Sequence, residues 1–439
     1  MSHPTSISDF LAARVASLKW TGRALRSRNF RLFFAGHGIS LIGTWMQRVA
    51  MGWLVYRLTD SPLLLGSVEF VGQLSAVLVA PLAGMAADHK DRRRLILLTQ
   101  AMAMVQATLL AVLVLTGAIE VWHLFVLGIM LGIINGFDMP ARQSFIIEMI
   151  DNKDDLPNAI ALNSTIINGA RMVGPSVAGL TVAAVGEGVC FSINAASYLA
   201  VIVALLRIHV VPRRRPAQRP GFLAGLKEGL TYAGKSVPIR NTLVLNAVMN
   251  LAGTPYMALM PVLAKTVLGG GPQTLGLLMS SAGVGALGGA LYLASRARPE
   301  GLPRLMAVAC CSFALGIIAL SQSRFLPLSM LLMVFTGFGI VAQLASANTL
   351  LQSIVDDDKR GRVMSLHMVS FMGTAPFGSL WGGAAATHIG APLTLVIGGS
   401  LCLVSAAAFI WQMPRMMAIL LPLLERKRRE GAGESPAAK

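Results

Sequence analysis

The sequence has few charged side chains. Asp, Glu, Lys and Arg make up 13% of its 439 residues, and 54% of the residues are hydrophobic. A soluble domain usually has roughly 25% charged residues, so a water-soluble fold of this size would need a more polar surface. The shortage of charge excludes an ordinary soluble protein. It predicts that much of the surface faces lipid, on helices of about 20 apolar residues that cross a bilayer.

Cysteine and aromatic residues are also scarce. The four cysteines, Cys190, Cys310, Cys311 and Cys402, lie in or beside apolar runs without metal-ligand or CxxC spacing, which predicts packing residues and no metal site. No GxxxxGK[ST] phosphate-binding motif is present, so ATP is not the expected energy source. Glycine, in contrast, is abundant at 44 residues, as in tightly packed transmembrane helices.

The chain contains twelve apolar runs that are each long enough to cross a membrane. They cover residues 31–57, 62–83, 95–117, 121–147, 158–184, 188–208, 241–267, 272–295, 304–323, 327–354, 363–387 and 391–413. The runs predict an all-α membrane protein with two six-helix halves, residues 31–208 and 241–413. The other segments are an N-terminal segment (1–30), a polar central loop (209–240) and a basic tail (414–439).

Lys and Arg lie mostly on one side of the predicted membrane. With the N-terminus placed in the cytoplasm, 31 of the 37 basic residues fall in cytoplasmic segments, three on the opposite side and three within helices. Cytoplasmic loops of membrane proteins carry such an excess, so both termini are expected in the cytoplasm. The formal net charge of +17 therefore does not indicate nucleic-acid binding, because the basic residues anchor many short loops and form no single patch.

The two predicted halves resemble each other in sequence. A shift of 204 residues aligns Gly169, Gly174, Gly179 and Gly186 with Gly373, Gly378, Gly383 and Gly390. A shift of 210 residues aligns Pro62 and Gly66 with Pro272 and Gly276. A parallel repeat of two six-helix halves is the arrangement of major facilitator transporters, in which the substrate binds near the membrane midplane between the halves.

A charged stretch, "GMAADHKDRRRLILL" (84–98), interrupts the apolar sequence between the second and third runs. It resembles the G-x-x-x-D-R-x-G-R-R signature loop of the major facilitator superfamily. The matching residues are Gly84, Asp88, Arg92 and Arg93, and Asp91 stands where the family has glycine. The resemblance implies a cytoplasmic gate in which the arginines pair with acidic residues such as Glu148, with Arg142 close by. The alternative is that the arginines only fix the topology.

Longer segments are similar to one branch of this superfamily, the transmembrane secretion effectors, which include enterobactin exporters and macrolide-efflux proteins. They are residues 28–66, 87–100, 135–150, 170–179 and 356–366. Within 170–179, Gly174 and Pro175 match the antiporter motif of the fifth helix, and Gly179 comes one residue late. The resemblance implies proton-driven export of a siderophore, drug or other natural product across a bacterial inner membrane. The alternatives are a proton-coupled importer and a membrane sensor that transports nothing.

Several charged residues lie inside the predicted helices. Each costs about 2.5–3.5 kcal/mol at the bilayer centre on insertion scales, so each is expected to face the bundle interior beside a partner. Helix positions bring Arg48 within reach of Glu69, whereas Asp138 and Arg142 are spaced i, i+4 on one helix. Glu69 or Asp138 is the expected proton carrier, and permanent ion pairing is the alternative. Arg171 is a further intramembrane charge.

The first, fourth, seventh and tenth helices are expected to line the substrate cavity. The polar residues expected there are Gln47, Arg48, Asn135, Asp138, Asn246, Asn250 and Gln343. His37, His367 and His388 are scattered along the sequence and are interpreted as packed or interfacial residues. The sequence thus predicts a monomeric transporter, with no enzymatic activity and no cofactor, whose partners are a small-molecule substrate, protons and the lipid bilayer.

Overall fold

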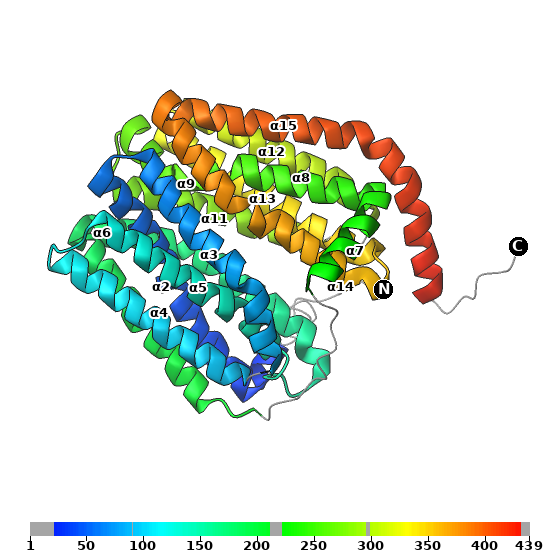
Figure 1. Ribbon diagram of the computed structural model, residues 1–439, viewed down its shortest axis with the longest axis horizontal. Helices are drawn as coiled ribbons and strands as arrows, with labels where there is room; N and C mark the ends of the chain where they lie inside the picture. Colours follow the sequence, from blue (N-terminus) through cyan, green and yellow to red (C-terminus); the bar gives the residue numbers. More distant parts are fainter. Residues whose placement is uncertain (1–21, 90, 211–221, 296–298, 432–439) are drawn as a thin grey trace, which may run out of the picture.

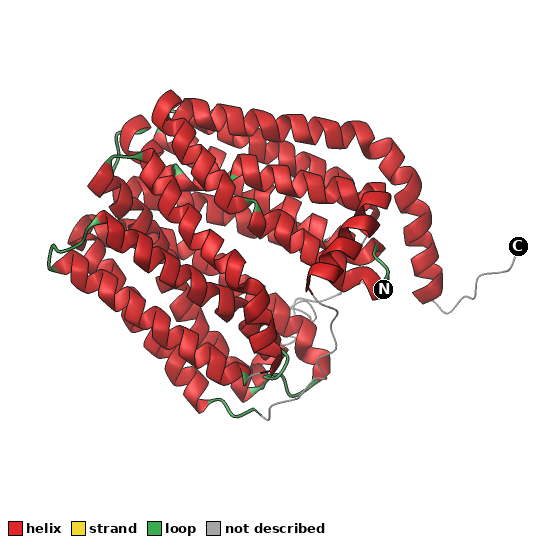
Figure 2. Ribbon diagram, viewed as in Figure 1, coloured by secondary structure: helices red, strands yellow, loops and turns green. Residues whose placement is uncertain are grey.

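The computed structural model describes residues 22–89, 91–210, 222–295 and 299–431, which form helices joined by short loops, with no strand (Figure 2). Nine helices in this part of the chain are long and apolar enough to cross a membrane. Two of these, α6 and α15, each contain two spans joined at a bend. A further long helix, α2, completes the predicted set of twelve spans. The all-α, twelve-helix prediction is therefore confirmed.

The first half contains six spans in five helices (Figure 1). They are α2 (Arg28–Thr59), α3 (Pro62–His89), α4 (Arg92–Leu115), α5 (Val121–Ile146) and the two parts of α6 (Leu156–Arg207). Two short 3₁₀ helices, Arg23–Arg26 and Lys153–Asp155, precede α2 and α6. The bend of α6 lies at Gly186, where φ is 84°. An L-residue with a side chain rarely adopts this angle, whereas glycine does so freely.

The second half repeats this pattern. Its first span is broken into α8 (Val237–Gly253), α9 (Pro255–Ala258), α10 (Met260–Val262) and a π-helix (Leu263–Val267). It continues with α11 (Pro272–Ala294), a 3₁₀ helix (Pro299–Gly301), α12 (Leu302–Gln322), α13 (Leu326–Ile354), α14 (Asp357–Met368), a π-helix (Val369–Gly373) and α15 (Ala375–Gly431). The bend of α15 lies at Gly390, where φ is 80°. The shift that aligns Gly186 with Gly390 thus matches two bends of the same kind.

The polar central segment and the basic tail contain more helix than the apolar runs predict. Part of the central segment forms α7 (Phe222–Lys235), in which Glu228 accepts a hydrogen bond from Lys359 at 2.7 Å and pairs with Arg362. The bond from Lys359 holds the pKa of Glu228 below its usual value. Helix α15 continues past residue 413 to Gly431, and its Lys427 donates to the carbonyl of Val355 at 2.6 Å.

The halves contact each other mainly through two pairs of helices, α6 with α11 and α3 with α15 (Figure 1). Both contacts bring backbone against backbone at a glycine pair. A Cβ added to Gly179 would lie 3.1 Å from the Cα of Gly276, and one added to Gly383 would lie 3.0 Å from the Cα of Gly66. The two sequence shifts map one pair onto the other, so the interface has an approximate two-fold symmetry.

The two ends of the bundle differ. One end, here called the basic end, carries α7, α14 and the loop between α3 and α4, and the helices of the two halves diverge toward it (Figure 1). The opposite end is held together by an ion pair at 2.5 Å between Asp60 in the first half and Lys265 in the second. Ser176 also donates to Ser280 across the interface at 2.7 Å. Both contacts join the two halves.

Candidate functional site

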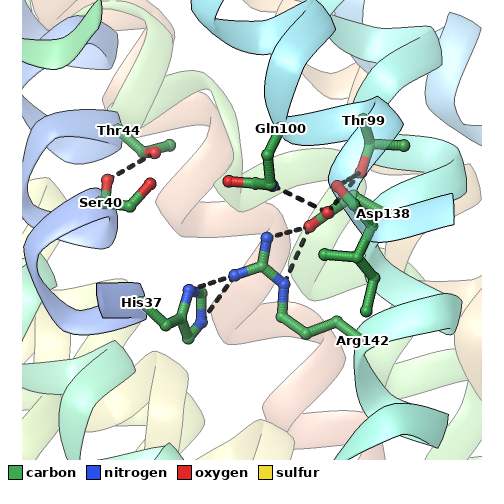
Figure 3. Close-up of polar contacts among 8 residues, drawn as sticks. His37, Ser40, Thr44, Thr99, Gln100, Asp138 and Arg142 are labelled. Carbon is green, nitrogen blue, oxygen red and sulfur yellow. Dashed lines mark hydrogen bonds and ion pairs between the residues drawn. The ribbon is translucent and has the colours of Figure 1, made fainter. Parts of the chain in front are cut away.

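Asp138 is the centre of a polar cluster inside the first half (Figure 3). Its side chain lies on α5 and the residue is only 7% exposed. One carboxylate oxygen accepts from Thr99 and Gln100 of α4, both at 2.8 Å. The other accepts from the Nε of Arg142, one helical turn away, at 2.9 Å. The predicted pairing of Asp138 with Arg142 is therefore present, and three side chains satisfy the carboxylate.

His37 extends this cluster to α2. A terminal nitrogen of Arg142 lies 2.8 Å from the Nε2 of His37 (Figure 3), and the imidazole stacks on Phe33 at a centroid distance of 5.0 Å. From the sequence, His37 is interpreted as a packed or interfacial residue, and its contact with Arg142 is not predicted. The sequence does contain an indication of a polar cluster here. Ser40 and Gln47 follow His37 on the same buried face of an otherwise apolar helix.

Arg48 and Glu69 form a second ion pair, between α2 and α3. Their closest nitrogen and oxygen atoms are 3.6 Å apart, and the side chains are 42% and 27% exposed. Glu69 also accepts from Gln73 at 2.9 Å, and Gln73 in turn contacts Ser379 of the second half at 3.4 Å. The predicted approach of Arg48 to Glu69 is therefore present. Unlike Asp138, Glu69 remains accessible.

A pocket lies between the two halves beside this pair. Its lining consists of Arg48, Val49, Gly52, Leu65, Glu69, Gln73, Thr254, Met257, Ala258, Pro261, Leu275, Met279 and Ser379. Residues from α2 and α3 form one wall, and residues from α9, α10, α11 and α15 form the other. Arg48 and Glu69 are the charged members of a lining that is otherwise apolar or neutral. An apolar lining with a few polar groups is the composition typical of sites that bind organic molecules.

Five of the predicted cavity residues are buried inside their own halves, and Asp138, described above, is one of them. Gln47 is 2% exposed, donates to Gln106 at 2.9 Å and accepts from Asn194 at 2.6 Å. In this structure these hydrogen bonds turn its amide toward α4 and α6, and its place in a substrate cavity stays a prediction. The sequence pattern does not distinguish an amide that bonds within one half from an amide that lines a cavity, because both lie on the inner face of the helix.

The other three are the polar residues of the second half. Asn246 is fully buried and donates to Ser370, and Asn250 donates to the Asn246 carbonyl one turn earlier, both at 2.9 Å. Gln343 is 1% exposed. These amides pack within the second half, outside the lining of the pocket described above, and their role in a substrate cavity stays a prediction. Asn135 is exposed on α5, outside the pocket lining.

The predicted gate residues lie at the basic end, and the contacts described for them are with residues of the first half. Arg92 forms an ion pair with Glu148, and both side chains are nearly buried. Arg93 donates to the carbonyls of Leu205 and Leu206 at the end of α6, at 2.7 and 2.9 Å. The pairing of Arg92 with Glu148 is the one that the sequence predicts.

The remaining positions of the signature loop have different roles. The side chain of Asp91 caps α4 by accepting from the backbone N–H of Arg94 at 3.2 Å. The aspartate that replaces the family's glycine thus acts as a helix N-cap. Gly84 lies on α3, with open space where a Cβ would be. The side chain of Asp88 lies outside the described residues.

The motif of the fifth helix lies where three helices meet. A Cβ on Gly174 would lie 2.5 Å from the Cβ of Trp45 on α2, so α6 and α2 are in close contact there. The carbonyl of Pro175 and the Cα of Gly179 face Gly276 of α11 across the interface. Arg171, one turn before Gly174, places its guanidinium carbon 5.1 Å from the centre of the Trp45 ring.

Two ion pairs at the opposite end were not predicted. Arg57 at the end of α2 contacts Glu187, just after the bend of α6, at 2.7 Å, and Asp60 contacts Lys265. One feature of the sequence points to both pairs. Arg57 and Lys265 are two of the three basic residues on the predicted non-cytoplasmic side, which otherwise lacks positive charge. Among the described residues, no group of His, Cys, Asp and Glu is arranged to hold a metal ion.

The chain is similar in sequence to known transport and efflux proteins. Residues 21–425 match the family model of the transmembrane secretion effectors. The chain is 26% identical to a staphyloferrin A transporter of Staphylococcus aureus, over 87% of this chain and 96% of the relative. It is 27% identical to the multidrug efflux pump Tap of Mycolicibacterium fortuitum, over 82% and 88%. It is 21% identical to macrolide efflux protein A of Streptococcus pyogenes, over 85% and 93%.

Solved structures show the same fold at lower sequence identity. A bacterial homologue of the lysosomal transporter Spinster, in an inward-facing and occupied conformation, superposes with a TM-score of 0.69 at 15% identity, covering 89% of this chain and 97% of that one. A peptide transporter in complex with alafosfalin also gives 0.69, at 14% identity, covering 89% and 95%. These similarities concern the arrangement of the helices.

Proposed function

Because this chain belongs to the transmembrane secretion effector family of the major facilitator superfamily, we propose that it exports a small organic compound by proton-coupled alternating access. The family consists of membrane transporters, which confirms that the protein is not an enzyme. The observation that carries the proposal is the pocket between the halves, with the accessible pair of Arg48 and Glu69 in its wall. The relatives named for siderophore, multidrug and macrolide transport support export.

The excess of Lys and Arg at the basic end supports its placement in the cytoplasm. The structure then corresponds to an inward-facing state, because Asp60 and Lys265 join the halves at the opposite end. The return to an outward-facing state breaks that pair and rotates the halves about the two glycine contacts. The gate residues Arg92 and Arg93 lie at the end that closes in that step. Both termini lie in the cytoplasm in this arrangement.

Glu69 is the favoured proton carrier. It lines the pocket, and its partner Arg48 is 3.6 Å away, so a proton can reach the carboxylate without disrupting a buried network. Asp138 is nearly buried and accepts from three side chains. A proton on Asp138 would leave the Arg142 charge inside the bundle without its partner, which is costly. Asp138 therefore fits the role of a permanent ion-pair member.

Inside-out membrane vesicles test this function. With an imposed gradient, acidic inside, we expect them to accumulate erythromycin or ethidium, and we expect a protonophore to abolish accumulation. Glu69→Gln should abolish the gradient-driven accumulation while leaving the exchange of labelled for unlabelled compound, because the pocket remains. Full pH-dependent accumulation by Glu69→Gln would exclude Glu69 as the carrier.

The same vesicles separate the alternatives. An importer would move the compound out of inside-out vesicles when the gradient is imposed. A sensor would move none across a broad panel that includes siderophores and neutral, cationic and anionic drugs.

A further inference from the structure

Arg171 is an intramembrane cation without a carboxylate partner among the described residues. It lies 15 residues from the start of α6 and 15 from the bend at Gly186. At 1.5 Å rise per residue, this is about 22 Å from either end of the span, near the middle of the membrane. Charged residues at this depth are rare and pair with one another or line a cavity. Arg171 therefore requires an explanation.

The guanidinium of Arg171 also lacks hydrogen bonds. Its Nε is buried and has no hydrogen-bond partner. Its two terminal nitrogens make no hydrogen bond or ion pair with any described residue, and they are not among the buried unpaired atoms. They are therefore not fully enclosed. Because the guanidinium makes no hydrogen bond, it keeps its N–H donors in the planar fork that a carboxylate or phosphate group accepts in bidentate form.

A second arginine lies beside the same aromatic ring. The guanidinium carbon of Arg48 is 5.6 Å from the centre of the Trp45 ring, and that of Arg171 is 5.1 Å from it. The two guanidinium groups therefore lie beside one ring, where two positive charges repel each other. Glu69 is the carboxylate paired with Arg48. Two cations thus share one anion, and the cluster retains one positive charge.

The tight packing of α6 on α2 fixes this arrangement. Gly174 lets the backbone of α6 approach Trp45, and the carbonyl of Arg171 lies against Gly283 of α11. Arg171 is therefore held at the junction of the two halves, and Arg48 lines the pocket there. The ring of Trp45 gives each cation a favourable face, but it does not neutralise the excess charge.

We propose that Arg171, together with Arg48 and Trp45, binds an anionic group of the transported compound, so that the substrates of this protein include organic carboxylates. This inference rests on the proposed export function and specifies its substrate class. The anionic group pairs with Arg171 and supplies the missing negative charge, while an apolar or aromatic part of the compound packs against Trp45 and the apolar wall of the pocket. Arg48 remains shared between Glu69 and the compound.

A pair of probes that differ only in charge tests the proposal. The full chain in lipid nanodiscs is titrated with 4-biphenylcarboxylate and with 4-biphenylcarboxamide, and binding is followed by saturation-transfer NMR. We expect the carboxylate to bind at least about tenfold more tightly than the amide, a difference of about 1.4 kcal/mol. Arg171→Gln should remove this preference. Arg171→Lys should keep part of it, because the charge remains and the planar donor fork does not.

Arg240→Gln is the matched control, because Arg240 is an exposed arginine at the start of α8 and its substitution removes the same charge. This variant should keep the preference, and the melting temperature of every variant is recorded so that loss of folding is recognised. Equal binding of the two probes, or an unchanged preference in Arg171→Gln, would overturn the anion site. If vesicles still export a neutral drug in that case, the export function stands. Anion binding without transport of any compound would instead contradict the export function.

Discussion

Asp138 accepts hydrogen bonds from three side chains inside the first half, two on α4 and one on its own helix. Arg142 bridges this carboxylate to His37 on α2. The cluster therefore joins three helices through polar contacts in a part of the molecule where the other contacts are apolar. In a medium of low dielectric constant, a network of this kind is stable only while every member keeps its partner.

Removal of the carboxylate charge should therefore destabilise the first half. In Asp138→Asn the guanidinium of Arg142 loses its counter-ion, and breaking one side of a buried pair costs about 3–5 kcal/mol. We expect a clearly lower melting temperature in detergent, measured by size-exclusion chromatography after heating. The double variant Asp138→Asn/Arg142→Gln should recover part of the loss, because no unpaired charge remains. A single variant as stable as the parent would show that the network contributes little.

Single-residue contacts could be predicted from the sequence where helix geometry or a family motif fixes both partners. Spacing along one helix gives Asp138 with Arg142, and depth in the membrane gives Arg48 with Glu69. Contacts that depend on which helix faces which could not be predicted. His37 reaches Arg142, and Gln47 reaches Gln106, only because α2 packs beside α4 and α5. The pattern of polar and apolar residues along one helix is compatible with several different neighbouring helices.

At the scale of helices, the glycine pairs set the distance between the halves. The Cα of Gly276 faces Gly179 on α6, and a Cβ added to Gly276 would lie 2.5 Å from the carbonyl oxygen of Pro175. Backbone oxygens cannot move aside as a flexible side chain can. Small residues at such crossings allow close helix contact in membranes, and here the contact is the one about which the halves are proposed to move.

A methyl group at this crossing should interfere with transport. Gly276→Ala forces α6 and α11 apart, and overpacking of this kind costs about 1–3 kcal/mol. We expect slower export in inside-out vesicles and a lower melting temperature. Gly288→Ala on the same helix is the control, because the nearest atom to its Cβ would be 4.0 Å away, and it should behave like the parent. Equal effects of the two substitutions would contradict a special role for the crossing.

At the scale of the whole molecule, the described contacts between the halves include an ion pair at one end only. Asp60 and Lys265 join the halves opposite the basic end, and their side chains are 68% and 41% exposed. Because exposed pairs contribute at most about 1 kcal/mol, this pair biases the position of the halves without locking it. A transporter that alternates between two states requires a bias of this size, since a stronger contact would trap one state.

Reversal of one charge should shift this balance. Lys265→Glu places two carboxylates together, so the outward-facing population should rise by up to about fivefold, the equivalent of 1 kcal/mol. Spin labels at Thr116→Cys and Arg324→Cys, both exposed at this end, would report the change as a longer distance in electron double resonance, with the native cysteines replaced. The exchanged pair Asp60→Lys/Lys265→Asp should restore the shorter distance. An unchanged distance distribution in Lys265→Glu would assign closure to packing alone.

The overall architecture could be predicted from the sequence, whereas its conformational state could not. Apolar runs, the repeat and the loop charges determine the number of spans and the pairing of the halves. They are identical in the inward- and outward-facing states, so no pattern among them reports which end is closed. That information comes from pairs such as Asp60 with Lys265, whose partners are about 200 residues apart and belong to different halves.

The glycine contacts also bear on how the protein is put together. Gly66 and Gly179 of the first half meet Gly383 and Gly276 of the second through surfaces that belong to the helices themselves. A chain divided between α6 and α7 would keep these surfaces, because transmembrane helices that insert independently can associate afterwards by packing. The two halves therefore resemble two related subunits that are joined in one polypeptide.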